Sequence, residues 1–361
     1  MAYTNIDDPS AYFQTAIYNG QSGTQFDVTN DGNSDLQPDL IWFKDRGAAY
    51  SHYLVDSSRG RAKGLKSDTT AAETTSGQTN WDLVSFDSDG FEVGAPSEGE
   101  STNAGTTSKA AWQWKANGGT TASNTDGSIT STVQANQDAG FSIVTYTAPS
   151  STGNFTAGHG LGVKPDMVIT KSRSATGGWW IWHKDLAQPN YYIGLHSTGA
   201  QAFASNMWGA GFDTSTIGLN VTASGQASAT YIAYCFAEKQ GYSKFGKYVG
   251  NGNASGPFVY TGFKPSFLLV KITTASGYSW RLVDSARNTF NLTDRLLMPD
   301  NTSAEFDGST HASNLGFDFV SNGFKLRTTY YGMNGNTETF IYMAFAENPF
   351  VTSTGIPTTA R

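Results

Sequence analysis

Apolar segments that begin with proline recur three times along the chain, at residues 38–44, 165–171 and 265–271. In each, three apolar residues follow the second position, and a lysine stands six residues after the proline. Proline lacks the N–H that a sheet ladder needs, so it can begin a strand but is rare inside one. The unbroken apolar run predicts a strand buried on both faces, and we expect the lysine to return the chain to solvent.

A second pattern follows these segments. Residues 86–93 and 319–326 place Asp-Gly and Asn-Gly between apolar residues. These pairs favour a two-residue hairpin turn with positive φ at both positions. Residues 214–220 keep the glycine, Gly218, but put Ile217 before it, so we expect a turn of another type there.

A third pattern, of alternating aromatic residues, closes each copy at residues 111–117, 233–239 and 342–348. Such alternation predicts a half-buried strand. The three patterns keep one order and similar intervals, which chance similarity does not explain. We therefore expect three tandem related modules and a C-terminal tail, with the bounds 1–118, 119–240, 241–350 and 351–361.

Strand signals recur about every ten residues within each copy, and no helical period extends over a dozen residues. This rhythm predicts an all-β fold of three β-sandwich, jelly-roll-like modules. Residues 120–136 are rich in Thr, Ser, Gly and Asn, and we expect them to be a linker that leads into the second copy. Because the join at 239–241 is short, we expect the second and third copies to be rigidly stacked and the first to be more separate.

Two six-residue segments, 54–59 and 282–287, share the pattern Leu-Val-Asp-Ser-x-Arg. Aspartate and arginine three residues apart at a strand end can pair across a turn. We interpret this pair as mainly structural, with a functional charge pair as the alternative. The second copy keeps only residues 184–186 of the segment, so the pair is not required for a module to fold.

The composition excludes several classes of partner. Charged residues make up 15% of the 361 residues against a usual ~25%, and the net charge is −7. There is thus no basic surface for nucleic acid, no basic amphipathic stretch for a membrane surface and no apolar run near the ~20 residues of a spanning helix. The N-terminal residues lack the pattern of a secretory signal, and the single cysteine, Cys235, excludes an internal disulfide.

The search for catalytic patterns predicts a protein that is not an enzyme. The five histidines show no metal-ligand spacing, and there is no nucleophile elbow or catalytic-cysteine context. Residues 158–162 are glycine-rich but precede a strand, whereas a phosphate-binding loop needs a helix there. A pair of carboxylates brought together by folding, as in a polysaccharide-degrading module, stays open. We expect no cofactor, with calcium as the one alternative.

One loop has the spacing of a calcium site. Asp27, Thr29, Asp31 and Asp35 fall at loop positions 1, 3, 5 and 9, with Gly32 at position 6 for the sharp bend. Position 3 is threonine, no glutamate stands at position 12, and the other two copies have no equivalent acids. The alternative is a polar turn ahead of the first proline-led strand.

Three tryptophans within five residues are the main candidates for a binding surface. In a strand, Trp180 and Trp182 share one face while Trp179 lies on the other. Both faces are then apolar, which predicts a strand packed between two layers; a platform for sugar rings or for a partner is the alternative. Tyr330 and Tyr331 are further candidates of the same kind.

Four segments together carry a resemblance to a known family: 38–46, 51–60, 86–93 and 111–116. They are similar to a repeat domain of tailed bacteriophages, especially marine ones, and residues 345–350 resemble the C-terminal ending of that group. Proteins of this group are tail-fibre-like or virion structural proteins. The resemblance implies no catalytic residues.

The resemblance and the composition lead to one expected function, a non-enzymatic virion protein that is tail-associated or fibre-like. It would be assembled in the reducing host cytoplasm and exposed on the outside of the particle. Its expected partners are its own copies, with a homotrimer by analogy, other virion proteins, and a host surface receptor or glycan. A capsid-surface decoration or collar protein is one alternative, and a carbohydrate-binding or polysaccharide-degrading module is another.

Overall fold

The computed structural model of the chain describes residues 2–75, 83–95, 102–187, 189–222 and 225–358. The chain is all-β, with 43% of its residues in strands and 3% in helices. The helices are short: η1 (Pro9–Ala11), η2 (Gly308–Thr310) and α1 (Tyr331–Asn334). None of the helices in the described part is long and apolar enough to cross a membrane. The all-β class predicted from the strand rhythm is confirmed.

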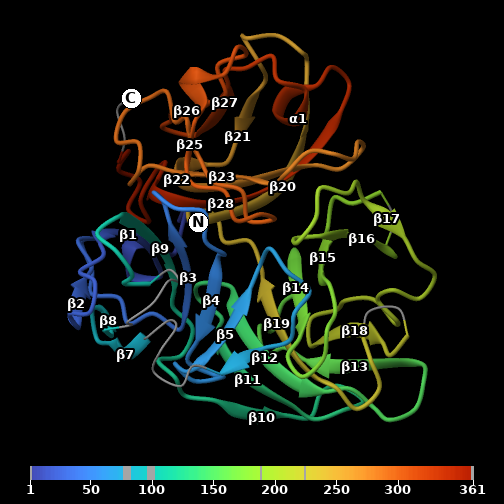
Figure 1. Cartoon of the computed structure of the whole chain (residues 1–361). Helices are drawn as coiled ribbons and strands as arrows, with labels where there is room; N and C mark the ends of the chain where they lie inside the picture. The colour runs from blue at the N-terminus through green and yellow to red at the C-terminus, as the bar shows by residue number, and fades with distance from the viewer. Residues whose placement is uncertain (1, 76–82, 96–101, 188, 223–224, 359–361) are drawn as a thin grey trace.

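Three antiparallel sheets, called here the main sheets, form the body of the molecule (Figure 1). The first has the order β1 (Phe13–Asn19), β9 (Ser108–Trp114), β3 (Leu40–Asp45), β4 (Tyr53–Asp56), β5 (Lys63–Lys66), β6 (Thr74–Thr75). The second has the order β10 (Ala122–Asn124), β11 (Ser131–Asn136), β12 (Phe141–Thr147), β19 (Thr230–Phe236), β14 (Met167–Ser172), β15 (Trp179–His183), β16 (Tyr191–Gly194), β17 (Ala202–Phe203). The third has the order β20 (Ser243–Val249), β28 (Thr339–Pro349), β22 (Phe263–Ile272), β23 (Arg281–Asp284).

The same four-strand arrangement lies at the centre of each main sheet. It reads β1-β9-β3-β4 in the first, β12-β19-β14-β15 in the second and β20-β28-β22-β23 in the third, always antiparallel. In each, the strand with the proline-led pattern pairs on one side with the closing aromatic strand. Positions in the three sheets can therefore be compared through the strand register.

A small sheet covers the outer face of each main sheet. The small sheets are β2 (Phe26–Thr29), β8 (Gly90–Val93), β7 (Leu83–Asp87); β13 (Asn154–Gly158), β18 (Thr216–Asn220); and β21 (Phe258–Tyr260), β27 (Gly323–Leu326), β26 (Phe317–Val320). A separate apolar cluster fills the space under each. A further pair, β24 (Arg295–Leu296) and β25 (Phe306–Asp307), lies beside the third main sheet. The sandwich packing expected from the sequence is thus present.

The inner faces of the three main sheets meet in one shared core, which Figure 1 shows as three lobes around a common centre. Phe13 stacks on Phe345 with ring centroids 5.1 Å apart, and Phe236 lies 6.1 Å from Phe345 and 6.5 Å from Trp114. These rings come from all three sheets. The expectation that the first copy is more separate than the others is therefore wrong, because all three bury their inner faces together.

The proline-led strands are buried on both faces, as predicted. In β3, Leu40 and Trp42 face the shared core, while Ile41 and Phe43 face the cluster under the small sheet. The closing strands, predicted to be half-buried, are almost fully buried for the same reason.

Two hairpins occur where they were predicted, but their turns differ. The strand register makes Ser88–Asp89 and Ser321–Asn322 the turn residues, so Gly90 and Gly323 begin the next strand. A Cβ atom at Gly90 would lie 2.0 Å from the carbonyl oxygen of Val28, and one at Gly323 would lie 2.1 Å from that of Val259. Each glycine is needed there because a neighbouring strand approaches closely.

The third glycine of this pattern and the predicted linker also differ from expectation. Gly218 lies inside β18 rather than in a turn, and its Cβ would be 2.2 Å from the carbonyl oxygen of Trp208. Residues 120–136 hold β10 and β11 of the second main sheet instead of a linker. Their polar composition reflects the exposure of β10, the edge strand of that sheet.

Candidate functional site

The lysines that close the proline-led strands are buried, so the expectation that they return to solvent is wrong. Lys44 and Lys271 are 0% exposed and Lys171 is 1% exposed. Their positive charges stay inside because backbone carbonyl groups surround each ammonium. Desolvation by burial lowers the pKa of each of the three to about 8.

Each lysine joins its own main sheet to the next. Lys44 Nζ donates to the carbonyl oxygen of Thr302, in the segment beside the third sheet, at 3.0 Å. Lys171 Nζ donates to that of Thr70, which follows β5 of the first sheet, at 3.3 Å.

Lys271 Nζ donates to the carbonyl oxygen of Thr198, which follows β16 of the second sheet, at 3.3 Å. The contacts run from the first sheet to the third, from the third to the second and from the second to the first. They form a closed ring, called here the lysine ring.

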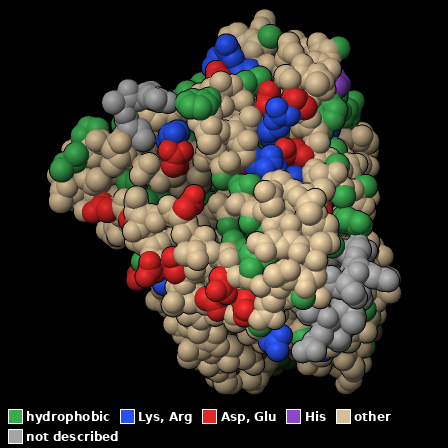
Figure 2. Space-filling model, turned by 60° about the vertical axis from the view of Figure 1, so that its left-hand side comes forward, with side chains coloured by type: hydrophobic (Ala, Val, Ile, Leu, Met, Phe, Trp, Pro, Cys, Tyr) green, Lys and Arg blue, Asp and Glu red, His purple; other side chains and the backbone are tan. Residues whose placement is uncertain are grey.

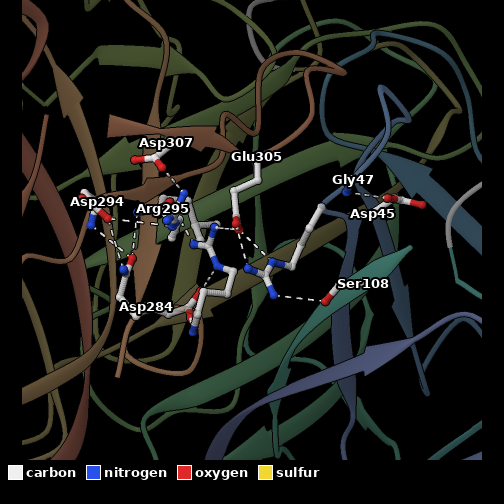
Figure 3. Close-up of polar contacts among 12 residues, drawn as sticks. Asp45, Gly47, Ser108, Asp284, Asp294, Arg295, Glu305 and Asp307 are labelled. Carbon is white, nitrogen blue, oxygen red and sulfur yellow. Dashed lines mark hydrogen bonds and ion pairs between the residues drawn. The ribbon is translucent and has the colours of Figure 1, made fainter. Parts of the chain in front are cut away.

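Buried charges reinforce the junction between the third and first sheets (Figure 3). Arg287 Nε lies 2.6 Å from a carboxylate oxygen of Asp284, and its Nη1 lies 2.9 Å from Glu305. Arg46, at the end of β3, places Nε and Nη2 each 2.8 Å from the two oxygens of Glu305, while its Nη1 donates to Ser108 Oγ. Glu305 thus pairs with Arg46 of the first sheet and with Arg287 of the third sheet.

The junction between the first and second sheets repeats this arrangement. Arg59 pairs with Asp56 and places Nη1 3.0 Å from Glu73, and Arg173 of the second sheet places Nε 2.9 Å from Glu73. The Asp–Arg pairs predicted from segments 54–59 and 282–287 therefore form, and each is extended by a glutamate and a second arginine. These contacts agree with the structural interpretation, and a functional charge pair stays the alternative.

The junction between the second and third sheets keeps the backbone contact, but the described residues form no arginine–glutamate network there. Its ion pairs are instead Glu238 with Lys244 and Asp185 with Lys247. Gln201 N–H donates to the carbonyl oxygen of Thr273 at 2.9 Å. The equivalent contact at the junction of the third and first sheets runs from Glu305 N–H to the carbonyl oxygen of Arg46, at 2.8 Å. His183 lies here as well, with Nε2 3.2 Å from the carbonyl oxygen of Tyr342. Burial lowers the pKa of His183 to about 4, so its ring is neutral at pH 7.

The two glutamates of these networks are fully engaged. Burial raises the pKa of Glu305, but the hydrogen bonds and charges of Arg46 and Arg287 outweigh it and hold that pKa below its usual value. The pKa of Glu73 is lowered in the same way by Arg173 and Arg59. Carboxylates held ionised between two guanidinium groups serve to fasten the sheets together.

The tryptophans predicted as candidates lie in β15 on both faces of the second main sheet. Trp179 belongs to the shared core and donates from Nε1 to the carbonyl oxygen of Lys66 at 2.7 Å. Trp182 is buried on the outer face and stacks on Phe212 with ring centroids 4.2 Å apart. Trp180 is half-buried on that same outer face. The burial of Trp179 and Trp182 agrees with a strand packed between two layers.

The two tyrosines lie at the start of α1: Tyr330 is the residue before the helix and Tyr331 is its first residue. Tyr331 is exposed, packs its ring 5.3 Å from that of Tyr278 and bonds Glu338 through its hydroxyl group. Tyr330 is half-buried, and its hydroxyl oxygen lies 3.4 Å from Arg281 Nη2. The hydroxyl group of Tyr330 thus contacts a buried charge, that of Arg281.

The predicted calcium ligands are not brought together. Asp27 and Thr29 lie in β2, opposite Glu92 and Gly90 of β8, and Asp31 and Asp35 are exposed beyond the strand. Within the described ranges, no three His, Cys, Asp or Glu side chains gather as a metal site would require. Calcium binding stays a prediction.

Comparison with known proteins gives one family. Residues 8–349 match the family described as Domain of unknown function (DUF7483). The chain belongs to the DUF7483 family. No curated protein and no solved structure matches it.

The extent of the DUF7483 match agrees with the packing. It runs from η1 to the end of β28 and so includes all three main sheets and the lysine ring. The DUF7483 unit is therefore the whole three-sheet body rather than one sheet with its cover.

One functional candidate escaped the sequence analysis. Arg281 opens β23 opposite Val270, at the position that Tyr53 occupies in the first sheet and Trp180 in the second. A buried arginine thus replaces an aromatic residue on the outer face of the third sheet. The signal is present in the sequence, but it appears only when the strand registers of the three sheets are compared.

Proposed function

We propose that the protein is a non-enzymatic structural component of a tailed bacteriophage particle, tail-associated or fibre-like, exposed on the particle and in contact with the host surface. The observation that carries this proposal is the closed lysine ring, which fastens three sheets around one core. The resemblance of the repeated segments to phage virion proteins supplies the biological setting.

A closed ring suits a part that must keep its shape outside the cell. The chain has a single cysteine, Cys235, which is buried, so the body is stabilised without an internal disulfide. The outer surface carries few charges: Figure 2 shows acidic and basic side chains in small separate groups on a face covered mainly by uncharged groups. Such a surface is compatible with close packing against other virion proteins.

The same proposal holds that residues 1–118, 119–240 and 241–350 are tandem copies of one module. The shared strand order and the equivalent contacts of Lys44, Lys171 and Lys271 support it. A chain that already closes three modules into a ring would join its own copies and other virion proteins through the outer sheets and loops.

Gold-labelled antibodies against the protein, applied to intact particles, test the location. We expect the label on the tail. A label spread over the capsid would favour a decoration protein instead, and the absence of the protein from purified particles would overturn the proposal. Turnover of host polysaccharide by the purified protein would contradict the non-enzymatic role.

A further inference from the structure

A small apolar pocket lies on the outer face of the third main sheet. It has a volume of about 160 Å³, and its apolar walls are Leu296, Met298, Phe306 and Leu315. Leu296 and Leu315 are buried, while Met298 and Phe306 are half-buried and so reach solvent. The remaining wall is polar and contains one of the more buried cations of the molecule, Arg281.

Arg281 is 7% exposed and is poorly satisfied. Its Nη1 lies 3.4 Å and 3.2 Å from the carbonyl oxygens of Ser279 and Trp280, and its Nη2 lies 3.4 Å from the hydroxyl group of Tyr330. In the described part of the chain no carboxylate forms an ion pair with it, whereas Arg287, equally buried, has Asp284 and Glu305. A guanidinium group has five N–H donors, and a buried one without an anion is costly.

The electrostatic balance around Arg281 is positive. Lys271, also buried, lies close enough to repel Arg281, and Asp300 attracts both. Burial raises the pKa of Asp300, whose carboxylate accepts a hydrogen bond from Trp280 N–H at 3.1 Å. Arg281 therefore has a second cation beside it and no paired carboxylate among the described residues, a setting that favours the entry of an anion.

The fold does not require a cation at this position. Its equivalents in the other two sheets are Tyr53 and Trp180, both aromatic. Arginine also keeps an aromatic neighbour here, since its guanidinium carbon lies 5.6 Å from the centre of the Tyr330 ring. The ring holds the guanidinium group against the pocket wall.

We propose that this pocket binds a carboxylate carried on a small apolar group. Arg281 donates two parallel hydrogen bonds to the carboxylate in a bidentate pair. The apolar part is enclosed by the rings of Phe306 and Tyr330 and by the two leucines. The carboxylate belongs either to a free small acid or to the C-terminal residue of a peptide. This binding is independent of where the protein sits on a particle, so its failure would leave the proposed structural role untouched.

Calorimetric titration of the full chain with 3-phenylpropionate, N-acetyl-phenylalanine and N-acetyl-phenylalaninamide tests the proposal. Both acids should bind with one site per chain, and the amide about tenfold or more weakly, because it lacks the charge that Arg281 pairs with. Tighter binding of a tripeptide ending in phenylalanine than of 3-phenylpropionate would indicate a peptide C-terminus, and the reverse a free acid. Equal affinity for acid and amide, or no binding of either acid, would overturn the proposal.

Two variants and a control locate the site. Arg281→Gln should weaken binding of the acids about tenfold while leaving the amide unchanged. Arg327→Gln, which removes an exposed arginine paired with Asp318 on the same module, should leave both unchanged. Should Arg281→Gln fail to fold, Met298→Trp, which fills the mouth of the pocket, must abolish binding of the acids; unchanged binding in that variant would refute the site.

Discussion

Lys44 Nζ, at the end of β3, donates a hydrogen bond to the carbonyl oxygen of Thr302 across 258 residues of sequence, at 3.0 Å. The carbonyl oxygens of Ala48 and Tyr50 accept from the same ammonium, at 3.1 Å and 2.6 Å. All three hydrogens of this buried cation therefore have acceptors. The contact joins the first main sheet to the third and is one member of the lysine ring.

Replacing Lys44 with methionine should lower the free energy of unfolding by about 2 kcal/mol or more, since three carbonyl groups lose their donor inside the protein. Chemical denaturation of the variant measures this. Lys247→Met is the matched control, because Lys247 is 55% exposed and its contact with Asp185 is 3.6 Å long. A loss no greater than that of the control would show that the ring contributes little to stability.

Glu305→Gln should destabilise the protein by about 3 kcal/mol, because the buried Arg287 and the partly buried Arg46 lose a shared carboxylate. The comparison is Glu347→Gln, a partly exposed carboxylate paired with Lys264, which should change stability by less than about 1 kcal/mol. Both are read from urea unfolding curves. Equal effects would mean that burial of the network does not matter.

Stability should fall as the pH drops from about 6.5 toward 4, the pKa of His183. Burial lowers the pKa of His52, His159 and His196 as well. Each ring therefore takes up a proton at a lower pH in the folded protein than in the unfolded chain, so acid favours unfolding in this window. His183→Gln should flatten the fall measured by thermal unfolding against pH, whereas His311→Gln, at a half-buried position just after η2, should preserve it.

The lysine ring should make the stability of the protein depend on pH in the alkaline range as well. The pKa of Lys44, Lys171 and Lys271 is about 8 in the folded protein and about 10.5 in the unfolded chain. Between these values the unfolded chain holds more protons, so the lysines make stability rise with pH there. Lys44→Met should reduce the rise in denaturation midpoint between pH 8 and 10, and an unchanged rise would contradict the assignment.

Gly323→Ala should destabilise the protein by about 3 kcal/mol, since the new methyl group would meet the carbonyl oxygen of Val259 at 2.1 Å. Gly177→Ala is the control, because a Cβ atom there meets only Ser172, at an ordinary 3.6 Å. Thermal unfolding of the two variants measures the difference. Similar melting temperatures would show that the strands beside Gly323 can move apart.

Local sequence patterns predicted where the strands lie better than they predicted what packs against the strands. The apolar run at residues 40–43 was sufficient to predict a strand buried on both faces, because each face needs only apolar side chains to pack. The Asp284–Arg287 pair was predictable because both partners lie within one turn.

Contacts that depend on distant segments were not predictable. From the sequence alone, Lys44 was expected to reach solvent. It is buried because its ammonium group binds the backbone carbonyl oxygen of residue 302, and every residue type has such a carbonyl group, so the sequence at that position gives no signal. Residues 122–124 hold no large apolar side chain because β10 is an exposed edge strand, and such a segment resembles a linker in sequence. Arg281 becomes conspicuous only once the register of β22 and β23 aligns it with Tyr53 and Trp180.

The central claim is that three sheets form one body, closed by the lysine ring around one core. Differential scanning calorimetry of the full chain tests it most directly. The account predicts a single transition whose calorimetric and van't Hoff enthalpies agree, since no sheet can leave without exposing the shared core. Two or three separate transitions, or a van't Hoff enthalpy near a third of the calorimetric one, would contradict it.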